Sequence, residues 1–113
     1  MRIALIRGDI DYERFLIKDK DGNLTNVDFD EVYFTVKKTT RDHAVIFQKK
    51  LTNGTITKNG LGDYQVKIES SDTDGLPYGD YVFDVQVSYL NEIKKTFVGK
   101  FAIMDEATFL ENE

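Results

Sequence analysis

The sequence predicts an all-β domain, an antiparallel β-sandwich of about seven strands. Apolar residues recur at every second position through most of the 113 residues, which is the periodicity of strands with one buried face. Turn-forming pairs such as Asn53-Gly54 and Asn59-Gly60 separate the alternating runs. A chain of this length can bury roughly two-thirds of its unfolded surface, so it can fold as one domain without disulfides or metal ions.

The strands are expected in a regular succession. In chain order they are a short run with Phe15 and Ile17 on one side, Glu31–Lys37, the apolar run Val45–Phe47, Tyr64–Ile68, Tyr81–Tyr89, and a last run through Phe97, Phe101 and Ile103. Most of these runs alternate apolar with polar residues, so one face of each is expected to be buried. Alternation does not decide which way the uniformly apolar run faces. Asn91-Glu92 is expected to close a tight hairpin between the last two strands.

Helical structure is expected only as one short turn near residues 70–76. Ser71 or Asp72 would cap this turn, because both side chains can accept a hydrogen bond from a free backbone N–H. We expect the sandwich to occupy residues 1–104. The acidic segment Asp105–Glu113 would then be a frayed end, a short helix or the start of a stalk.

The stretch from Leu76 to Tyr81 predicts a structural corner. Its sequence is Leu76-Pro77-Tyr78-Gly79-Asp80-Tyr81, and it ends one element and opens the long strand that follows. In Greek-key sandwiches a Tyr at this place folds back and donates its hydroxyl hydrogen to a backbone carbonyl a few residues upstream. Leu76, Pro77, Gly79 and Tyr81 are therefore the expected structural corner, with Tyr81 as its tyrosine.

Composition excludes several classes of function. The chain carries no Cys and a single His, His43, so thiolate metal sites, cysteine nucleophiles and His-rich metal sites within one chain are excluded. A net charge of −5 makes it a poor nucleic-acid binder, because phosphate contacts need a basic patch. We expect no cofactor. No apolar run is long enough for a membrane span or a signal-peptide core, so the chain is expected to stay in the cytosol where it is made.

Two short motifs have simple structural interpretations. Arg7-Gly8-Asp9 is the tripeptide that integrins recognise, but a polar bend before the next strand explains it better. The acidic run around Asp19, Asp21, Asn23, Asp28 and Asp30 resembles a calcium loop, yet Leu24 stands where an EF-hand needs Gly, and Asp30 where it needs Glu. A plain turn is the favoured interpretation, and a loose calcium site is the alternative.

Catalysis is not expected. Asp72, Asp74 and Asp80 lie in polar turn sequence, which predicts solvent exposure and ordinary ionisation. Ser70 and Ser71 have no general base nearby in the sequence, although members of a Ser–His–Asp triad need not be close in the chain. The sequence contains no nucleophile elbow, phosphate loop or metal-ligand spacing.

Several segments, in order along almost the whole chain, match one family. They are Arg7-Gly8-Asp9, Ile17–Asn23, Val32–Lys38, Ser71–Pro77 with Gly79, Tyr81, Asp84 and Val85, and Val98–Phe101. With these segments the sequence resembles the immunoglobulin-like N-terminal domain of phage baseplate upper proteins and related phage tail structural proteins. The resemblance implies an immunoglobulin-like sandwich and a virion component that anchors to neighbouring virion subunits. It implies no catalytic residues.

The expected role is therefore protein–protein assembly in a phage or prophage tail or baseplate. The expected partners are other virion subunits or a second copy of the chain, and the expected location is the virion, after the host cytoplasm. Five residues are candidate contacts because they break the alternation or lie in turns and the tail: Tyr33, Tyr78, Val82, Val98 and Phe109. The alternative is a cell-surface or secreted β-sandwich module that binds glycans or another adhesion ligand.

Overall fold

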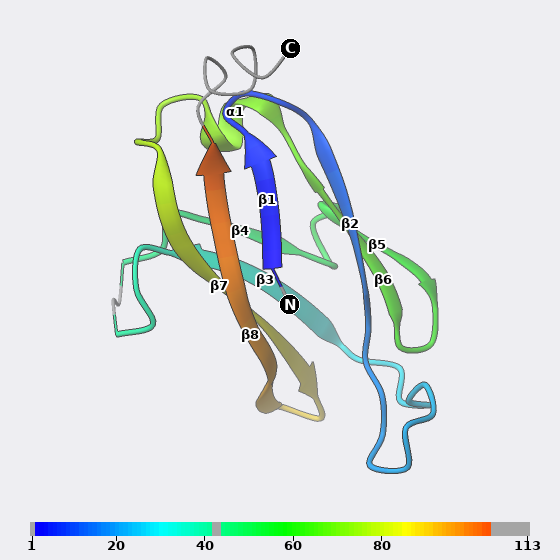
Figure 1. Ribbon diagram of the computed structural model, residues 1–113. Coiled ribbons are helices and arrows are strands. Elements are labelled where there is room, and N and C mark those ends of the chain that lie inside the picture. The colour runs from blue at the N-terminus through cyan, green and yellow to red at the C-terminus, as the bar shows by residue number, and fades with distance from the viewer. Residues whose placement is uncertain (1, 42–43, 105–113) are drawn as a thin grey trace.

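The computed structural model describes residues 2–41 and 44–104, with the backbone alone for Lys95 and Thr96. Within these ranges the chain forms a β-sandwich of two sheets and one short helix, so the predicted all-β sandwich is confirmed (Figure 1). The larger sheet contains, in order, β1 (Arg2–Ile6), β8 (Glu92–Met104), β7 (Gly79–Tyr89), β3 (Glu31–Lys37) and β4 (Phe47–Lys50). The smaller sheet contains β2 (Asp11–Leu16), β6 (Asp63–Ile68) and β5 (Ile56–Gly60).

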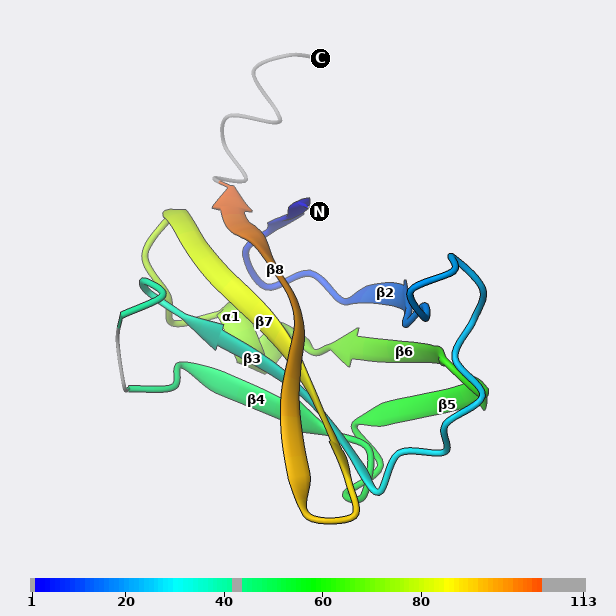
Figure 2. The same cartoon turned by 90° about the horizontal axis from the view of Figure 1, so that it is seen from below.

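The core lies between the two sheets, which Figure 2 shows on opposite sides of the molecule. Each sheet turns every second side chain inward, as the alternation predicts. Val32, Phe34 and Val36 of β3 are buried opposite Val66 and Ile68 of β6 in one hydrophobic cluster. Aromatic rings fill the larger spaces, with Phe34 stacked on Phe83 and Phe15 on Tyr64.

The strand order is that of the immunoglobulin fold. In that fold strand B pairs with E and E with D, while the other sheet runs G, F, C and, in the variable type, C′. Here β2, β6 and β5 stand in the B, E and D places, and β8, β7, β3 and β4 stand in the G, F, C and C′ places. Successive strands change sheets four times, after β1, β2, β4 and β6. The predicted Greek-key sandwich therefore matches the observed topology.

Three details of the strands differ from the prediction. The described residues form eight strands, and two of them, β1 and β5, are not among the six runs that the sequence indicated. The sandwich is not wholly antiparallel, since β1 pairs in parallel with β8. Val45–Phe47 is not itself a strand: β4 begins at Phe47, and Val45 is exposed.

Two turns differ from the prediction by a residue or two. Tyr89 pairs with Glu92, so Leu90 and Asn91, rather than Asn91 and Glu92, form the hairpin turn between β7 and β8. Both turn residues have positive φ, 51° and 68°, as a two-residue type I′ turn requires. The predicted helical turn is α1 (Ser70–Thr73), but its N-cap is Glu69. Asp72 accepts a hydrogen bond from the Glu69 N–H at 2.7 Å, so neither Ser71 nor Asp72 occupies the cap position itself.

The structural corner forms where it was predicted. The Tyr81 hydroxyl donates to the Pro77 carbonyl at 2.7 Å, and the Tyr81 ring is buried in the core. Gly79 has a φ of 135°, a conformation that residues with a Cβ rarely adopt. Leu76 packs against the core from the other end of the turn. These contacts fix the angle at which the chain leaves α1 and enters β7.

Candidate functional site

The motif Arg7-Gly8-Asp9 lies in the turn that follows β1, and its first two residues are bonded to the corner and to α1. The Gly8 N–H donates to the Thr73 hydroxyl at 2.9 Å, and Arg7 donates to the Leu76 carbonyl at 3.3 Å. The Arg7 guanidinium also lies 4.3 Å from the centre of the Tyr78 ring. These contacts agree with a polar bend. They also give Tyr78, a predicted interface residue, a partner inside its own chain.

Three of the four acidic loop residues, Asp19, Asp28 and Asp30, have a partner other than a metal ion for their carboxylate. The Asp19 carboxylate accepts hydrogen bonds from the backbone of Asp21 and Asn23, which closes the loop as a plain turn. Asp28 forms an ion pair with Lys58, and Asp30 accepts from the Leu90 N–H. Across residues 2–41 and 44–104, no three carboxylate or imidazole groups lie close enough together to hold a metal ion.

The residues considered for acid–base chemistry lie around α1. Asp72 pairs with Lys49 of β4 at 2.6 Å, and only 8% of the Lys49 side chain and 15% of the Asp72 side chain are exposed. Asp74, Asp80, Ser70 and Ser71 are exposed. His43 lies outside the described residues.

Three predicted interface residues lie on one surface, the outer face of the larger sheet. Tyr33 of β3, Val82 of β7 and Val98 of β8 alternate with buried residues of their strands. The register places Asp84 opposite Val98, and Lys100 opposite Val82, so the two valines are diagonal neighbours. Val98 is 44% exposed, whereas Tyr33 and Val82 are half-buried. Phe109, the remaining candidate, lies outside the described residues.

The outer edge of β8 is only partly covered. β1 pairs with Lys100–Met104, and Figure 1 shows β1 beside the upper part of β8 only. Within the part of the chain that the structure describes, no strand pairs with this edge between Glu92 and Gly99. An uncovered strand edge presents backbone N–H and C=O groups to an added strand.

An apolar groove, here called the β8 groove, runs along this uncovered edge. Three adjoining hollows of about 380, 300 and 170 Å³ form it. Leu16 and Phe97 line both the 380 Å³ and the 300 Å³ hollow. Phe29 and Val87 line both the 380 Å³ and the 170 Å³ hollow. Its lining residues are Arg14, Phe15, Leu16, Ile17, Lys18, Thr25, Val27, Phe29, Val87, Tyr89, Glu92, Lys94, Phe97 and Val98. The Phe15 ring meets Phe97 edge-on at 6.0 Å and closes the groove toward the core.

Exposed apolar side chains extend this surface onto the β7–β8 hairpin. Tyr89 lines the end of the groove and is 44% exposed, while Leu90 and Ile93 beside it are 72% and 61% exposed. Two lysines, Lys18 and Lys94, stand along the groove and are exposed. Arg14 is instead bound to Asp63, and this guanidinium lowers the pKa of the Asp63 carboxyl.

Glu13 is a charged group that the sequence analysis missed. It occupies an inward position of β2, two residues before Phe15 and opposite Val66. Burial, helped by the charge and hydrogen bonding of Asp11, raises the pKa of Glu13 to about 6. The signal was available, because Glu13 falls on the apolar parity of the run through Phe15 and Ile17.

Comparison with known proteins adds no assignment to this geometry. No protein-family model matches the chain, and no curated protein matches it. The described residues contain no helix of the length and apolarity needed to cross a bilayer.

Proposed function

We propose that this domain is a structural assembly module of a phage or prophage virion, of the tail or baseplate type. It acts by binding other virion subunits and carries out no catalysis. The virion context comes from the sequence resemblance across the corner and the central strands. The observation that carries the binding role is the β8 groove, an apolar channel beside an uncovered strand edge.

The groove favours an extended protein segment as its occupant. An added strand would satisfy backbone groups of β8, and its alternate side chains would enter the hollows lined by Phe29, Phe97 and Leu16. Lys18 and Lys94 would meet acidic residues that flank the apolar positions of that segment. The exposed hairpin residues Leu90 and Ile93 would add apolar contact area at one end.

Binding is tested by measuring the native mass of the protein, alone and mixed with the products of the neighbouring genes. We expect a complex with one of these proteins or a defined homo-oligomer. Leu16→Glu and Val98→Glu should each abolish it by placing a charge in the apolar groove. Val45→Glu is the matched control, because Val45 is equally exposed but lies before β4, at the opposite edge of the sheet.

Strand addition is tested by amide hydrogen exchange of the complex. We expect exchange to slow on alternate residues between Ile93 and Val98 when the partner binds. A protein that remains a strict monomer in every mixture would contradict the assembly role. A complex that forms without protection in β8 would show that the partner binds elsewhere.

A further inference from the structure

A second hollow, unconnected with the β8 groove, lies on the outer face of the smaller sheet. It has a volume of about 220 Å³ and is called here the β6 pocket. Its lining residues are Tyr12, Lys49, Gly54, Thr55, Thr57, Gln65, Lys67 and Glu69. The volume is below that of pockets for drug-sized ligands, so a ligand of about one ring fits it best.

Three adjacent strands supply the floor of the β6 pocket. Tyr12 of β2 stands opposite Lys67 of β6, and Thr57 of β5 stands opposite Gln65 of β6. The four side chains therefore project from the same face of the sheet. Tyr12 lines the pocket and is 56% exposed, and the Lys67 ammonium lies over its ring, 5.8 Å from the ring centre.

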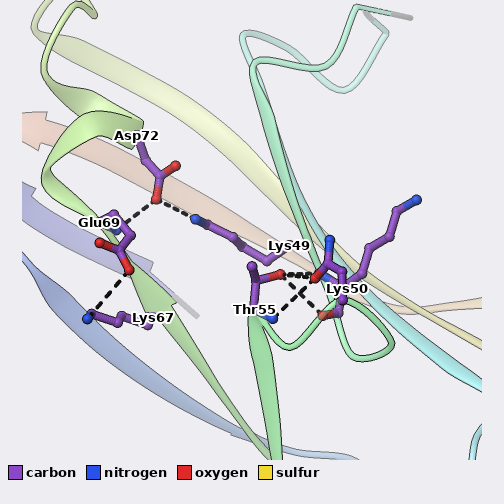
Figure 3. Close-up of polar contacts among 7 residues, drawn as sticks. Lys49, Lys50, Thr55, Lys67, Glu69 and Asp72 are labelled. Carbon is purple, nitrogen blue, oxygen red and sulfur yellow. Dashed lines mark hydrogen bonds and ion pairs between the residues drawn. The ribbon is translucent and has the colours of Figure 1, made fainter.

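The charges around the β6 pocket are already balanced. Lys49 pairs with Asp72 at 2.6 Å, and Lys67 pairs with Glu69 at 3.4 Å. Figure 3 shows Lys49 reaching from β4 toward Asp72, and Lys67 reaching toward Glu69. Because each lysine has its own carboxylate, the pocket offers a charged ligand no unpaired opposite charge.

The remaining polar groups suit a ligand with several hydroxyls. The Gln65 amide and the Thr57 hydroxyl each combine a donor and an acceptor, and the ion pair of Lys67 and Glu69 adds one strong donor and one strong acceptor. Thr55 is occupied, since its hydroxyl is bonded to Lys50 and Asn53. A pyranose ring has hydroxyls that both donate and accept, and an apolar C–H face that packs against an aromatic ring.

We propose that the β6 pocket binds a neutral sugar ring, with Tyr12 against the face of the ring and Gln65, Lys67 and Glu69 bonding its hydroxyls. The site is independent of the β8 groove, so it stands or falls without the assembly role. A single ring with so few contacts should bind with a Kd of the order of 1 mM.

The test is a titration of the ¹⁵N-labelled full chain with four methyl glycosides, those of glucose, galactose, mannose and N-acetylglucosamine, each to about 100 mM. We expect at least one of them to shift the amide signals of Tyr12, Gln65 and Lys67 in a saturable way. Tyr12→Ala should weaken that binding about tenfold, and Gln65→Ala should also weaken it. Tyr89→Ala is the control, because it removes an exposed tyrosine from the β8 groove and should leave the titration unchanged.

Two results would overturn the proposal. The first is that none of the four glycosides shifts these signals, or that they bind Tyr12→Ala as tightly as the original chain. The second is that inorganic phosphate or sulfate saturates the same signals at lower concentration than any glycoside. The lysines would then bind an anion despite their carboxylate partners.

Discussion

Tyr81 is the first buried residue of β7, and its hydroxyl binds the corner by donating to the Pro77 carbonyl. Substitution by Phe removes this hydrogen bond and keeps the aromatic ring. Tyr81→Phe should lower the free energy of unfolding by about 1–3 kcal/mol, because the Pro77 carbonyl loses its partner in a part-buried place. Urea denaturation measures this loss. Tyr89→Phe, at an exposed tyrosine, should stay within about 0.5 kcal/mol. An unchanged midpoint for Tyr81→Phe would show that the corner does not need this bond.

Because Glu13 is partly buried, the free energy of unfolding depends on the pH. Its pKa is about 6 in the folded protein, above its ordinary value of 4.5. The folded state therefore binds this proton more tightly than the unfolded chain does, and the associated stability is lost as pH rises from 4.5 through about 6.

Glu13→Gln should therefore raise the Tm at about pH 7.5. This gain in Tm should shrink toward zero below pH 4.5, the ordinary pKa of the glutamate. Thermal melts of both proteins across this range measure the difference. Glu92→Gln, at the exposed start of β8, controls for the loss of one negative charge. A gain that is equal at both ends of the range would contradict the effect of burial on Glu13.

At the scale of elements, the β5–β6 turn is held against the loop that follows β2. Gly62 has a φ of 76°, and a Cβ there would lie 2.8 Å from the Ile17 carbonyl and 3.1 Å from Thr25. The Gly62 carbonyl also accepts from the Ile17 N–H at 2.7 Å. This turn therefore needs glycine both for its backbone conformation and for the close approach of another segment.

Gly62→Ala and Gly22→Ala form a matched pair. Both glycines have positive φ, but a Cβ on Gly22 would meet nothing within 4 Å. Each change should lower the free energy of unfolding by about 1–2 kcal/mol, because alanine disfavours positive φ. Gly62→Ala should lower it by about 1–3 kcal/mol more, because its Cβ would clash with the Ile17 carbonyl. Chemical denaturation of both variants gives the difference directly. Equal losses would show that the loop shifts aside freely.

The elements that the sequence predicted well are those with long alternating runs. The bounds of β3 were predicted correctly, and β6 and β7 begin only one or two residues earlier than expected. β5 was missed because Ile56 is its only buried residue, so it has no alternation to detect. The turn at Leu90 was misplaced because sequence rules assign positive φ to Gly, Asn or Asp rather than to Leu.

At the scale of the whole molecule, the sandwich is closed by the two strands that are farthest apart in sequence. β1 pairs with the end of β8, so almost the entire chain lies between the partners. Closing so long a loop is entropically costly until the intervening strands are in place. We therefore expect β1 to join the sheet after the folding transition state.

Leu5→Ala in β1 and Val85→Ala in β7 test this order. Both residues are buried, so each change should destabilise the protein enough for reliable kinetics. Leu5→Ala should mainly speed unfolding, with a φ-value below about 0.3, whereas Val85→Ala should slow folding, with a φ-value above about 0.5. Stopped-flow folding and unfolding rates across a range of urea concentrations measure both. A higher φ-value for Leu5→Ala than for Val85→Ala would show that β1 joins the sheet before β7 is formed.

The same non-local pairing explains how much of the candidate surface was predictable. Tyr33, Val82 and Val98 were found because they break the alternation of single strands, and they do share one sheet face. The β8 groove was not predicted, because it exists only where β1 stops pairing at Lys100 and β2 passes nearby. The β6 pocket likewise needs three strands in register, which no single run reveals.

The left-handed conformation of Leu90 lowers thermal stability, whereas its side chain favours binding at the proposed contact surface. A leucine at φ 51° costs about 1–2 kcal/mol that glycine would not, yet its exposed side chain is the apolar tip of the proposed contact surface. Leu90→Gly should therefore melt at a higher temperature while binding the proposed partner of this surface less well. A library of variants selected only for a high Tm would enrich such changes. The selected domains would be more stable but would have lost the proposed binding.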